Sequence, residues 1–387
     1  MKLLYIANMR LPTEKAHSIQ AMQMCAAFAL HNANDTNYHT NAANKIEVEL
    51  VVPCRFNKIK SDPFEYYGLE KNFKLTKLPC LDLIPWLGHF GLWVETASFA
   101  LSLFVYTLFK KADIVYTRDK SCLFLAFFRK NVFFEAHTFP KNYYLYSHWL
   151  KKARGIITIT NGLKELFAEK GLKTGKIMVA PDAVDLERFV IEENREQCRQ
   201  KLGLPLGKRI ALYAGHLYPW KGVDTLIEAA RYLGDDVVIY LVGGTKEDIE
   251  RLKTSDFSPT INLVGHRPYS EIPYWMRAAD VLVLPNSGKE EISRHWTSPL
   301  KMFEYMASKK PVVASDLPSL REVLNNDNAV LVRPDSAEDL ASGIKTVLEN
   351  ASLAEKIAET AFRDVKRRTW QERAGSISEF FNASFHQ

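Results

Sequence analysis

The chain of 387 residues is long enough for two or three domains, which excludes a single small module. Hydrophobic residues make up 47% of it and charged residues 25%, values that are typical of a folded globular protein and exclude intrinsic disorder. Lys and Arg outnumber Asp and Glu by 51 to 45, and the net charge of +6 favours an anionic ligand or surface without requiring nucleic acid as a partner.

The first half of the chain alternates short apolar runs with segments of helical period, which predicts strands and helices in turn. Strands are predicted at residues 2–7, 46–52, 114–117, 132–135, 156–160 and 177–180, and helices at 18–30 and 161–169. Residues 31–44 contain five Asn and no aliphatic pattern, so we expect a solvated loop between the first helix and the second strand.

Residues 92–109 are largely apolar and also predict a helix. Glu95, Ser98 and Ser102 fall on one stripe of it, which argues against a helix that spans a lipid bilayer. Its large apolar side chains are Leu92, Trp93, Phe99, Leu103, Phe104 and Leu108, and Lys110 and Lys111 follow directly. Two interpretations stay open, because periodicity does not separate a helix that packs on the first sheet from one that docks on a membrane to reach a lipid-linked acceptor.

The second half of the chain repeats the alternation after a turn-rich stretch at residues 181–206. Its predicted strands are 210–215, 237–242, 261–264, 281–284 and 311–315, and its predicted helices include 223–232 and 270–279. This pattern is typical of parallel sheets in βαβ units, and eleven strands exceed one sheet. We therefore predict an α/β protein with two Rossmann-like domains that face a central cleft. The predicted domains are residues 1–185 and 186–365, and residues 366–387 form a helix that packs back toward the first domain.

The loop after the strand that ends at Leu284 leads into a predicted anion site. Ser298 is suited to cap the next helix and Pro299 to its first position, where the missing N–H costs nothing. The uncovered N–H groups and the helix dipole at such an end attract anions, whereas a lysine in the first turn opposes the dipole. Lys301 therefore makes best sense beside a bound anion, although a lysine that points into water would also fit the pattern.

A second loop follows the same logic. Residues 216–222 come after the strand 210–215, and Lys221 lies directly before the helix predicted from Val223. Two lysines at two helix starts suit a diphosphate, whose charges need more than one cation. The local pattern alone leaves an ordinary surface lysine equally open.

Four segments of the chain resemble the family 4 retaining glycosyltransferases, the glycosyl transferases group 1. They are Tyr213–Ala229 with its Lys-Gly pair, Ser298–Ser315, Ala180–Phe189 and Ala279–Pro285. The N-terminal half resembles the family only in its strand order and in Phe134-Glu-Ala-His137.

This resemblance implies the GT-B fold and the transfer of a hexose-type sugar from a nucleoside diphosphate sugar, with retention, in polysaccharide or glycolipid assembly. Lys221 and Lys301 would stabilise the diphosphate as catalytic residues, and His137 would face the transferred sugar. Glu304 would hold the ribose hydroxyls. The implied donor-binding residues are His216, Gly222, Gly265, His266, Arg267, Ser298, Pro299, Leu300 and Glu304.

Three positions depart from the family pattern. Trp296 stands where the family has a carboxylate, although Glu290 or Glu291 could supply one, and His216 stands where the family has Arg. The glycine pair after the first strand is replaced by a charged segment, whose acceptor-side candidates are Arg10, Lys15 and His17. Two alternatives therefore stay open beside a transferase: a catalytically silent scaffold that binds sugar nucleotides, and a nucleotide-sugar epimerase.

The sequence predicts neither a metal site nor a cofactor beyond the donor sugar nucleotide. It contains no Asp-x-Asp pair and no Gly-x-Gly fingerprint, and its five cysteines are too widely spaced for a local zinc knuckle. We expect reduced thiols and a cytoplasmic protein, either dissolved or bound peripherally at the inner face of the membrane. The predicted partners are the nucleotide sugar and a saccharide or lipid-linked acceptor, and no nucleic acid.

Overall fold

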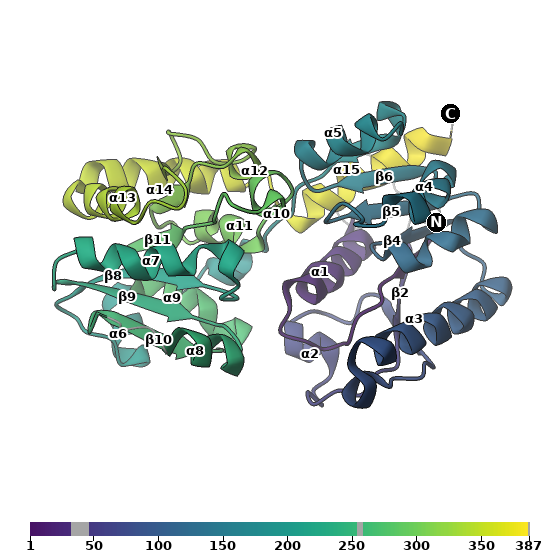
Figure 1. Cartoon of the computed structure of the whole chain (residues 1–387), viewed down its shortest axis with the longest axis horizontal. Helices are drawn as coiled ribbons and strands as arrows, with labels where there is room; N and C mark the ends of the chain where they lie inside the picture. The colour runs from purple at the N-terminus through teal and green to yellow at the C-terminus, as the bar shows by residue number, and fades with distance from the viewer. Residues whose placement is uncertain (32–45, 254–257, 386–387) are drawn as a thin grey trace. The chain divides into compact units, whose positions relative to one another are not determined.

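The computed structural model describes residues 1–31, 46–253 and 258–385, so the expected loop at 31–44 lies outside the described residues except for His31. The chain forms two compact units (Figure 1). Unit 1 consists of Met1–Pro181 and Trp370–Gln387, and unit 2 is Asp182–Thr369. The sequence places these boundaries after residues 185 and 365.

Unit 1 contains a parallel sheet of seven strands in the order β3-β2-β1-β4-β5-β6-β7. The strands are β1 (Lys2–Ile6), β2 (Glu47–Pro53), β3 (Lys74–Leu78), β4 (Ile114–Thr117), β5 (Val132–Ala136), β6 (Gly155–Thr158) and β7 (Ile177–Val179). The central strands β1, β4 and β5 are almost completely buried, which accounts for their nearly continuous apolar sequences.

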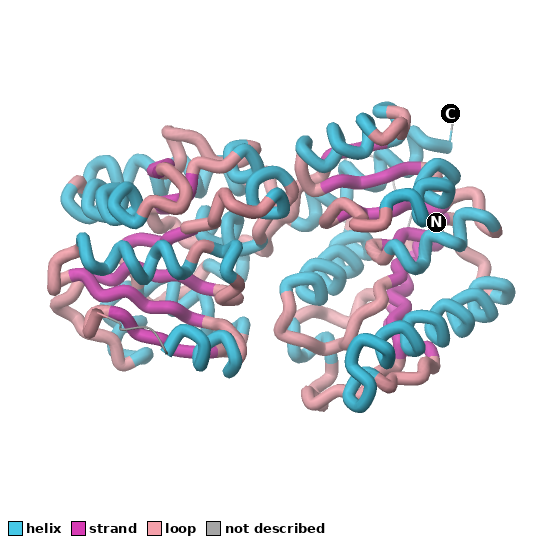
Figure 2. The backbone as a smooth tube through the Cα atoms, in the orientation of Figure 1, coloured by secondary structure: helices cyan, strands magenta, loops and turns pink. Residues whose placement is uncertain are grey.

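The helices of unit 1 pack on both faces of this sheet (Figure 2). They are α1 (Ala16–Leu30), α2 (Pro63–Tyr67), α3 (Ile84–Phe109), η2 (Lys120–Phe127), α4 (Tyr143–Lys152), α5 (Asn161–Glu169), η3 (Thr174–Lys176) and α15 (Trp370–Phe385). On one face, apolar residues of β1 and β4 pack with α3 and η2. On the other face, Phe28 of α1 and Phe381 of α15 stack with their centres 6.0 Å apart, and both contact Tyr116. The C-terminal helix thus completes the core of unit 1.

Unit 2 contains a parallel sheet of six strands in the order β10-β9-β8-β11-β12-β13. The strands are β8 (Arg209–Ala214), β9 (Val237–Val242), β10 (Ile261–Gly265), β11 (Val281–Leu284), β12 (Val312–Ser315) and β13 (Val330–Val332). Alternate residues of β8 enter two separate apolar clusters, with Ile210 and Leu212 in one and Ala211 and Tyr213 in the other. The sheet therefore has a core on each face, as a Rossmann-like domain requires.

The helices of unit 2 connect these strands in βα alternation. They are η4 (Glu187–Phe189), α6 (Arg195–Leu202), η5 (Pro219–Lys221), α7 (Val223–Ala229), η6 (Ala230–Tyr232), α8 (Lys246–Lys253), η7 (Tyr269–Glu271), α9 (Ile272–Ala278), α10 (Glu291–His295), α11 (Leu300–Ala307), α12 (Pro318–Arg321), α13 (Ala337–Glu349) and α14 (Ala351–Val365). The prediction of two Rossmann-like domains is confirmed.

In each sheet, the order in which the chain adds strands reverses once. In unit 1 the chain runs from β1 outward to β3 and returns to β4, and in unit 2 it runs from β8 outward to β10 and returns to β11. Ligands of open α/β sheets bind beyond the carboxyl ends of the strands at such a switch point. We therefore expect ligand sites at the loops after β1 and β4 in unit 1 and after β8 and β11 in unit 2.

Candidate functional site

The two loops at the switch point of unit 2 are packed against each other. Gly222, directly before α7, has a left-handed φ of 71°, and a Cβ there would lie 1.7 Å from the carbonyl oxygen of Pro285. The amide of Ser287 donates a hydrogen bond to the carbonyl of Trp220 at 3.0 Å. Only glycine allows this approach, so Gly222 fixes the loop that carries Lys221 against the loop after β11.

Lys301 projects from the first turn of α11 into the space beneath Gly215. Its side chain is only 9% exposed, and its Nζ lies 3.6 Å from the centre of the Tyr213 ring. A Cβ on Gly215 would lie 2.5 Å from that Nζ, so the glycine makes room for the ammonium group. Within the described residues, the Nζ of Lys301 has no hydrogen-bond partner.

Lys221 is close enough to act electrostatically on Lys301, and no ion pair between Lys301 and a carboxylate is found in the described part of the chain. Burial and the nearby Lys221 hold the pKa of Lys301 well below its usual range, although Glu304 acts in the opposite direction. The Lys221 side chain is half-buried with its ammonium enclosed 3.7 Å from the centre of the Trp220 ring, and burial lowers its pKa to about 7. Such a pair is costly unless an anion compensates it, so the loops form a candidate anion site.

The start of α11 differs from the sequence expectation. The helix begins at Leu300 with Pro299 as its N-cap, and no side chain caps it. The expectation that Ser298 caps this helix is wrong, because its Oγ instead accepts a hydrogen bond from the amide of Asp182 at 3.0 Å. The first-turn amides, including those of Leu300 and Lys301, are therefore without a side-chain cap at the same place as the two lysines.

Glu304 lies one turn further along α11 and is only 8% exposed. Its Oε1 accepts a hydrogen bond from the hydroxyl of Tyr269 at 2.7 Å, and the Arg188 guanidinium lies 4.3 Å above the Tyr269 ring. Burial raises the pKa of the Glu304 carboxyl. One carboxylate oxygen is therefore held, while the other can accept a hydrogen bond from a ligand.

The remaining predicted donor residues occupy the same edge of the sheet. Gly265 ends β10 in a left-handed conformation, and the side chains of His266 and Arg267 that follow are exposed. After β8, the ring of His216 stacks on Tyr218 with their centres 5.1 Å apart and their planes 8° from parallel. These residues lie at the carboxyl ends of β10 and β8, which β9 separates in the sheet.

The position where a family carboxylate is expected holds a half-buried Trp296 directly after α10. Glu290 and Glu291 are both exposed. Glu291 forms surface ion pairs with Arg294 at 3.4 Å and with His295 at 3.8 Å. Neither glutamate is buried with the two lysines, so the structure provides no substitute carboxylate there among the described residues.

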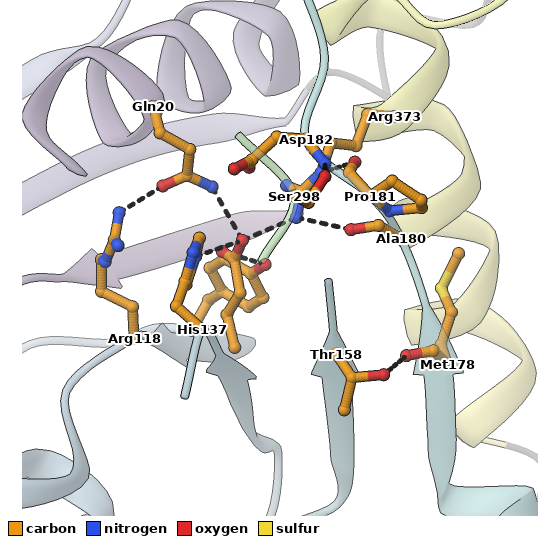
Figure 3. A network of polar contacts seen from close by, with 12 residues as sticks. Gln20, Arg118, His137, Thr158, Met178, Ala180, Pro181, Asp182, Ser298 and Arg373 are labelled. Atoms are coloured by element: carbon orange, nitrogen blue, oxygen red, sulfur yellow. Dashed lines mark hydrogen bonds and ion pairs between the residues drawn. The ribbon is translucent and has the colours of Figure 1, made fainter. Parts of the chain in front are cut away.

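In unit 1, His137 follows the carboxyl end of β5 and is held by a buried carboxylate (Figure 3). Its Nε2 lies 3.0 Å from Oε1 of Glu135, which has no exposed surface. The same carboxylate accepts hydrogen bonds from Gln20 at 2.7 Å, from Arg373 of α15 at 2.6 Å and from the Tyr116 hydroxyl at 2.6 Å. Burial alone would raise the pKa of Glu135, but Arg373 and His137 hold it well below its usual range. His137 is thereby positioned at the sheet edge.

The charged segment after β1 lies at the switch point of unit 1. Arg10 is half-buried, and its Nε has no hydrogen-bond partner within the described residues. Lys15 is exposed directly before α1, and the carbonyl of His17 accepts a hydrogen bond from Arg118 at 2.8 Å. Arg118 follows β4 and also donates to Gln20 at 2.5 Å, which joins this segment to the carboxylate network around His137.

A known family matches the second unit. The sequence model described as "Glycosyl transferases group 1" covers residues 194–364, which include both lysine loops and Glu304. Unit 2 is therefore similar to the group 1 glycosyl transferases over these residues. The resemblance found in the sequence is confirmed.

Curated relatives have glycosyltransferase names. The D-inositol 3-phosphate glycosyltransferase of Streptomyces bingchenggensis is 27% identical over 233 residues, which cover 56% of this chain and 50% of that protein. The phosphatidyl-myo-inositol mannosyltransferase of Mycobacterium leprae is 30% identical over 206 residues, which cover 52% of this chain and 53% of that protein. The chain thus spans about half the length of these curated relatives.

Solved structures match over the whole chain. Sucrose-phosphate synthase from Thermosynechococcus elongatus has a TM-score of 0.77 at 18% identity, over 100% of this chain and 99% of its own. Anabaena HepE in complex with UDP-glucose has a TM-score of 0.70 at 18% identity, over 99% of this chain and 100% of its own. These similarities show the fold, which is GT-B as the resemblance implies.

Several residues of the candidate site are not among those predicted from the sequence. Asn286, two residues after β11, has no exposed surface, and neither its amide nitrogen nor its oxygen has a partner within the described residues. Tyr269 orients Glu304, and Glu135 orients His137. A polar residue shortly after an apolar strand was the available signal for Asn286, and a charge inside Val132–Ala136 was the signal for Glu135.

Proposed function

We propose that the chain is a retaining glycosyltransferase that moves a hexose from a nucleoside diphosphate sugar to an acceptor hydroxyl. The observation that carries the proposal is the pair Lys221 and Lys301, whose ammonium groups lie against the Trp220 and Tyr213 rings on the two loops that meet at Gly222 and at the uncapped start of α11. A diphosphate would supply the negative charge that this arrangement lacks. Glu304 would accept a hydrogen bond from a ribose hydroxyl, and Gly265 to Arg267 would line the nucleobase.

The proposed chemistry follows from where charge develops. When the bond between the anomeric carbon and the diphosphate oxygen breaks, negative charge accumulates on the departing diphosphate. Fixed ammonium groups and amide dipoles stabilise that charge more in the transition state than in the ground state, which lowers the barrier. Lys221 and Lys301 therefore act as catalytic residues in this proposal, and His137 contacts the transferred sugar.

The two lysines and the amides of α11 can supply the positive charge that a metal ion supplies elsewhere. We therefore propose that the reaction needs neither a metal nor a cofactor apart from the sugar nucleotide. The absence of any Asp-x-Asp pair from the sequence agrees with this proposal.

We place the reaction in polysaccharide or glycolipid assembly, with a saccharide or lipid-linked acceptor. The names of two relatives include D-inositol 3-phosphate and phosphatidyl-myo-inositol, which supports a hydroxyl acceptor that is joined to an anionic group or a lipid. The acceptor side would use Arg10, Lys15 and His17. We further propose a cytoplasmic protein, bound peripherally at the inner face of the membrane and without nucleic acid as a partner.

A second candidate function rests on Trp296, which occupies the place of the family's carboxylate. A catalytically silent scaffold would bind the sugar nucleotide and leave it unchanged, and an epimerase would return an isomerised donor. Incubation with UDP, GDP and ADP sugars, followed by chromatography of the nucleotides, separates the three. We expect free nucleoside diphosphate when an acceptor extract is present. Unchanged or isomerised donor in every reaction would contradict the transferase.

A further inference from the structure

The helix α3 lies along unit 1 with one side fixed to the domain (Figure 2). Phe99 and Leu103 are 1% and 0% exposed and pack with the sheet. Glu95 on the same side is fully buried, and one of its carboxylate oxygens accepts a hydrogen bond from Asn8 Nδ2 at 3.3 Å. Phe99 and Leu103 therefore belong to the core, so this side of α3 packs on the sheet and is not available to a membrane.

The opposite side of α3 is apolar and open. Trp93 is 77% exposed, Leu101 66% and Phe109 85%, and Val105 and Leu108 continue the same stripe. Among the described residues, α3 is also the one helix whose length and composition alone would allow it to cross a membrane, with a mean hydropathy of 1.5 in its most apolar window and 22% of that window buried. Its packed side excludes a span, because crossing a bilayer would remove Glu95 and Phe99 from the domain.

The exposed side of α3 continues onto neighbouring elements. The ring of Phe104 lies 5.0 Å from that of Phe128, and the ring of Phe127 stacks on His148 of α4 at 5.3 Å. Phe127 and Phe128 are 45% and 61% exposed. We define the α3–η2–α4 surface by these exposed residues: Trp93, Leu101, Val105, Leu108, Phe109, Phe127 and Phe128.

The segment that carries this surface is rich in positive charge. Residues 84–152 contain nine Lys and Arg but only four Asp and Glu. Of the four acids, Glu95 and Glu135 are fully buried and Asp119 is half-buried, which leaves Asp113 as the exposed one. The exposed lysines are Lys111, Lys120, Lys130, Lys141, Lys151 and Lys152, and Lys152 lies 4.5 Å from the ring of Phe127. Lys110 is one of the nine basic residues but not one of these exposed lysines, because its ammonium pairs with Glu49.

We propose that the α3–η2–α4 surface docks unit 1 on an anionic lipid bilayer, with α3 in the plane of the interface. Trp and Phe side chains are suited to the headgroup region, and lysines beside them are attracted to anionic lipids. A second copy of the chain fits less well, because a symmetric dimer through this surface would bring identical lysines together. The docking rests on the proposed function in one respect: it would hold the enzyme where a lipid-linked acceptor lies.

Flotation of the full chain with vesicles tests the docking directly. We expect the protein to rise with vesicles that contain phosphatidylglycerol, to bind at least about tenfold less to vesicles of phosphatidylcholine alone, and to be released by high salt. A wild-type protein that stays at the bottom of the gradient with phosphatidylglycerol vesicles at low salt overturns the proposal.

Two variants locate the contact. W93S with F109S removes two exposed aromatic rings, and K151E with K152E reverses two exposed charges; each pair should lower vesicle partitioning at least about tenfold. The matched controls are V190S with L206S and K345E with K356E, which change exposed residues of unit 2 and should float like the wild type. Circular dichroism verifies that each variant is folded. Equal flotation of all four variants contradicts the proposal.

Sedimentation and calorimetry distinguish membrane docking from self-association and from nucleotide binding. If W93S with F109S abolishes self-association in sedimentation while the wild type never floats, the surface is a contact between copies and the membrane proposal is wrong. Nucleotide binding, measured by calorimetry without vesicles, uses unit 2 only. Protein that binds nucleoside diphosphate but no vesicles overturns the docking alone, and protein that binds vesicles but no nucleotide overturns the proposed function alone.

Discussion

Lys301 combines three properties that rarely occur together in one lysine. It is nine-tenths buried, it lies against an aromatic ring, and it has no anionic hydrogen-bond partner within the described residues. A second lysine nearby lowers its pKa further. A charge in such a place destabilises the protein by itself, so its presence is explained best by a ligand that restores the ammonium form.

The depressed pKa values predict that donor affinity falls as the pH rises. Burial lowers the pKa of Lys221 to about 7, so the free protein loses this positive charge above neutral pH. A bound diphosphate favours the charged form, and a sugar nucleotide has no titrating phosphate in this range. We expect the affinity for a donor sugar to fall toward about tenfold per pH unit above pH 7, as measured by calorimetry.

The variant Lys221→Arg is the control, because a guanidinium stays charged throughout this range. Its affinity should depend less on pH than that of the wild type. Identical profiles for the two proteins would show that Lys221 does not titrate in the site.

The position of the Glu304 carboxylate leads to a second prediction, which concerns donor affinity. Since Tyr269 holds one carboxylate oxygen, the other is placed to accept a ligand hydroxyl, and an ionised acceptor makes the stronger bond. Glu304→Gln should weaken donor binding by about 1 to 2 kcal/mol in calorimetry. Glu338→Gln, at an exposed position of α13, should have no effect. Unchanged affinity in Glu304→Gln would mean that the carboxylate only holds Tyr269.

At the scale of elements, the buried strands were predictable, and so were the edge strands β7 and β10. The apolar runs of β1 and β8 are distinctive because both faces of each strand are covered. The edge strands β3 and β13 were missed. The strand β3 is a mixed Lys-Leu-Thr sequence, and β13 is a run of only three residues. Local composition does not specify pairing at an edge.

Candidate residues were predictable where their chemistry depends on a helix start, as for Lys221 and Lys301. The roles of Asn286 and Glu135 depend instead on burial and on distant partners. Arg373, for example, reaches Glu135 across 238 positions of sequence. No local pattern contains such a contact, so only the folded chain reveals it.

The side chain of Arg373 joins α15 to the sheet of unit 1, and we expect its removal to lower the free energy of unfolding strongly. Arg373 donates to Glu135 at 2.6 Å and to the carbonyls of Ala180 and Pro181 at 3.1 and 2.8 Å. Arg373→Met would leave the Glu135 carboxylate buried without its main cation. We expect the free energy of unfolding to fall by about 3 to 5 kcal/mol in urea titrations.

Arg367→Met, which changes an exposed arginine of the segment before α15, is the matched control and should be close to neutral. If both variants unfold at the wild-type urea concentration, α15 is not held by this ion pair.

At the scale of the whole molecule, each unit has its own switch point with its own set of charged residues. Lys221, Lys301 and Glu304 belong to unit 2, and His137 belongs to unit 1 with Glu135, which accepts hydrogen bonds from Gln20 and Arg373. This division agrees with the proposed function, in which the sugar nucleotide binds one unit and the acceptor binds the other.

Because unit 2 supplies its own cations, the whole enzyme should work without divalent metal. We expect unchanged turnover after dialysis against EDTA, measured as release of nucleoside diphosphate. Loss of activity in the chelator that manganese or magnesium restores would contradict this expectation.

The central claim is that Lys221 and Lys301 bind and stabilise the diphosphate of a sugar nucleotide. The most direct test measures nucleoside diphosphate release by the wild type, Lys221→Ala, Lys301→Ala and the exposed control Lys345→Ala, with donor sugar and acceptor present. The account predicts that each site variant loses at least about tenfold in kcat/KM, or about 1.4 kcal/mol, with its fold intact, and that Lys345→Ala equals the wild type. Wild-type rates in both Lys221→Ala and Lys301→Ala would contradict it.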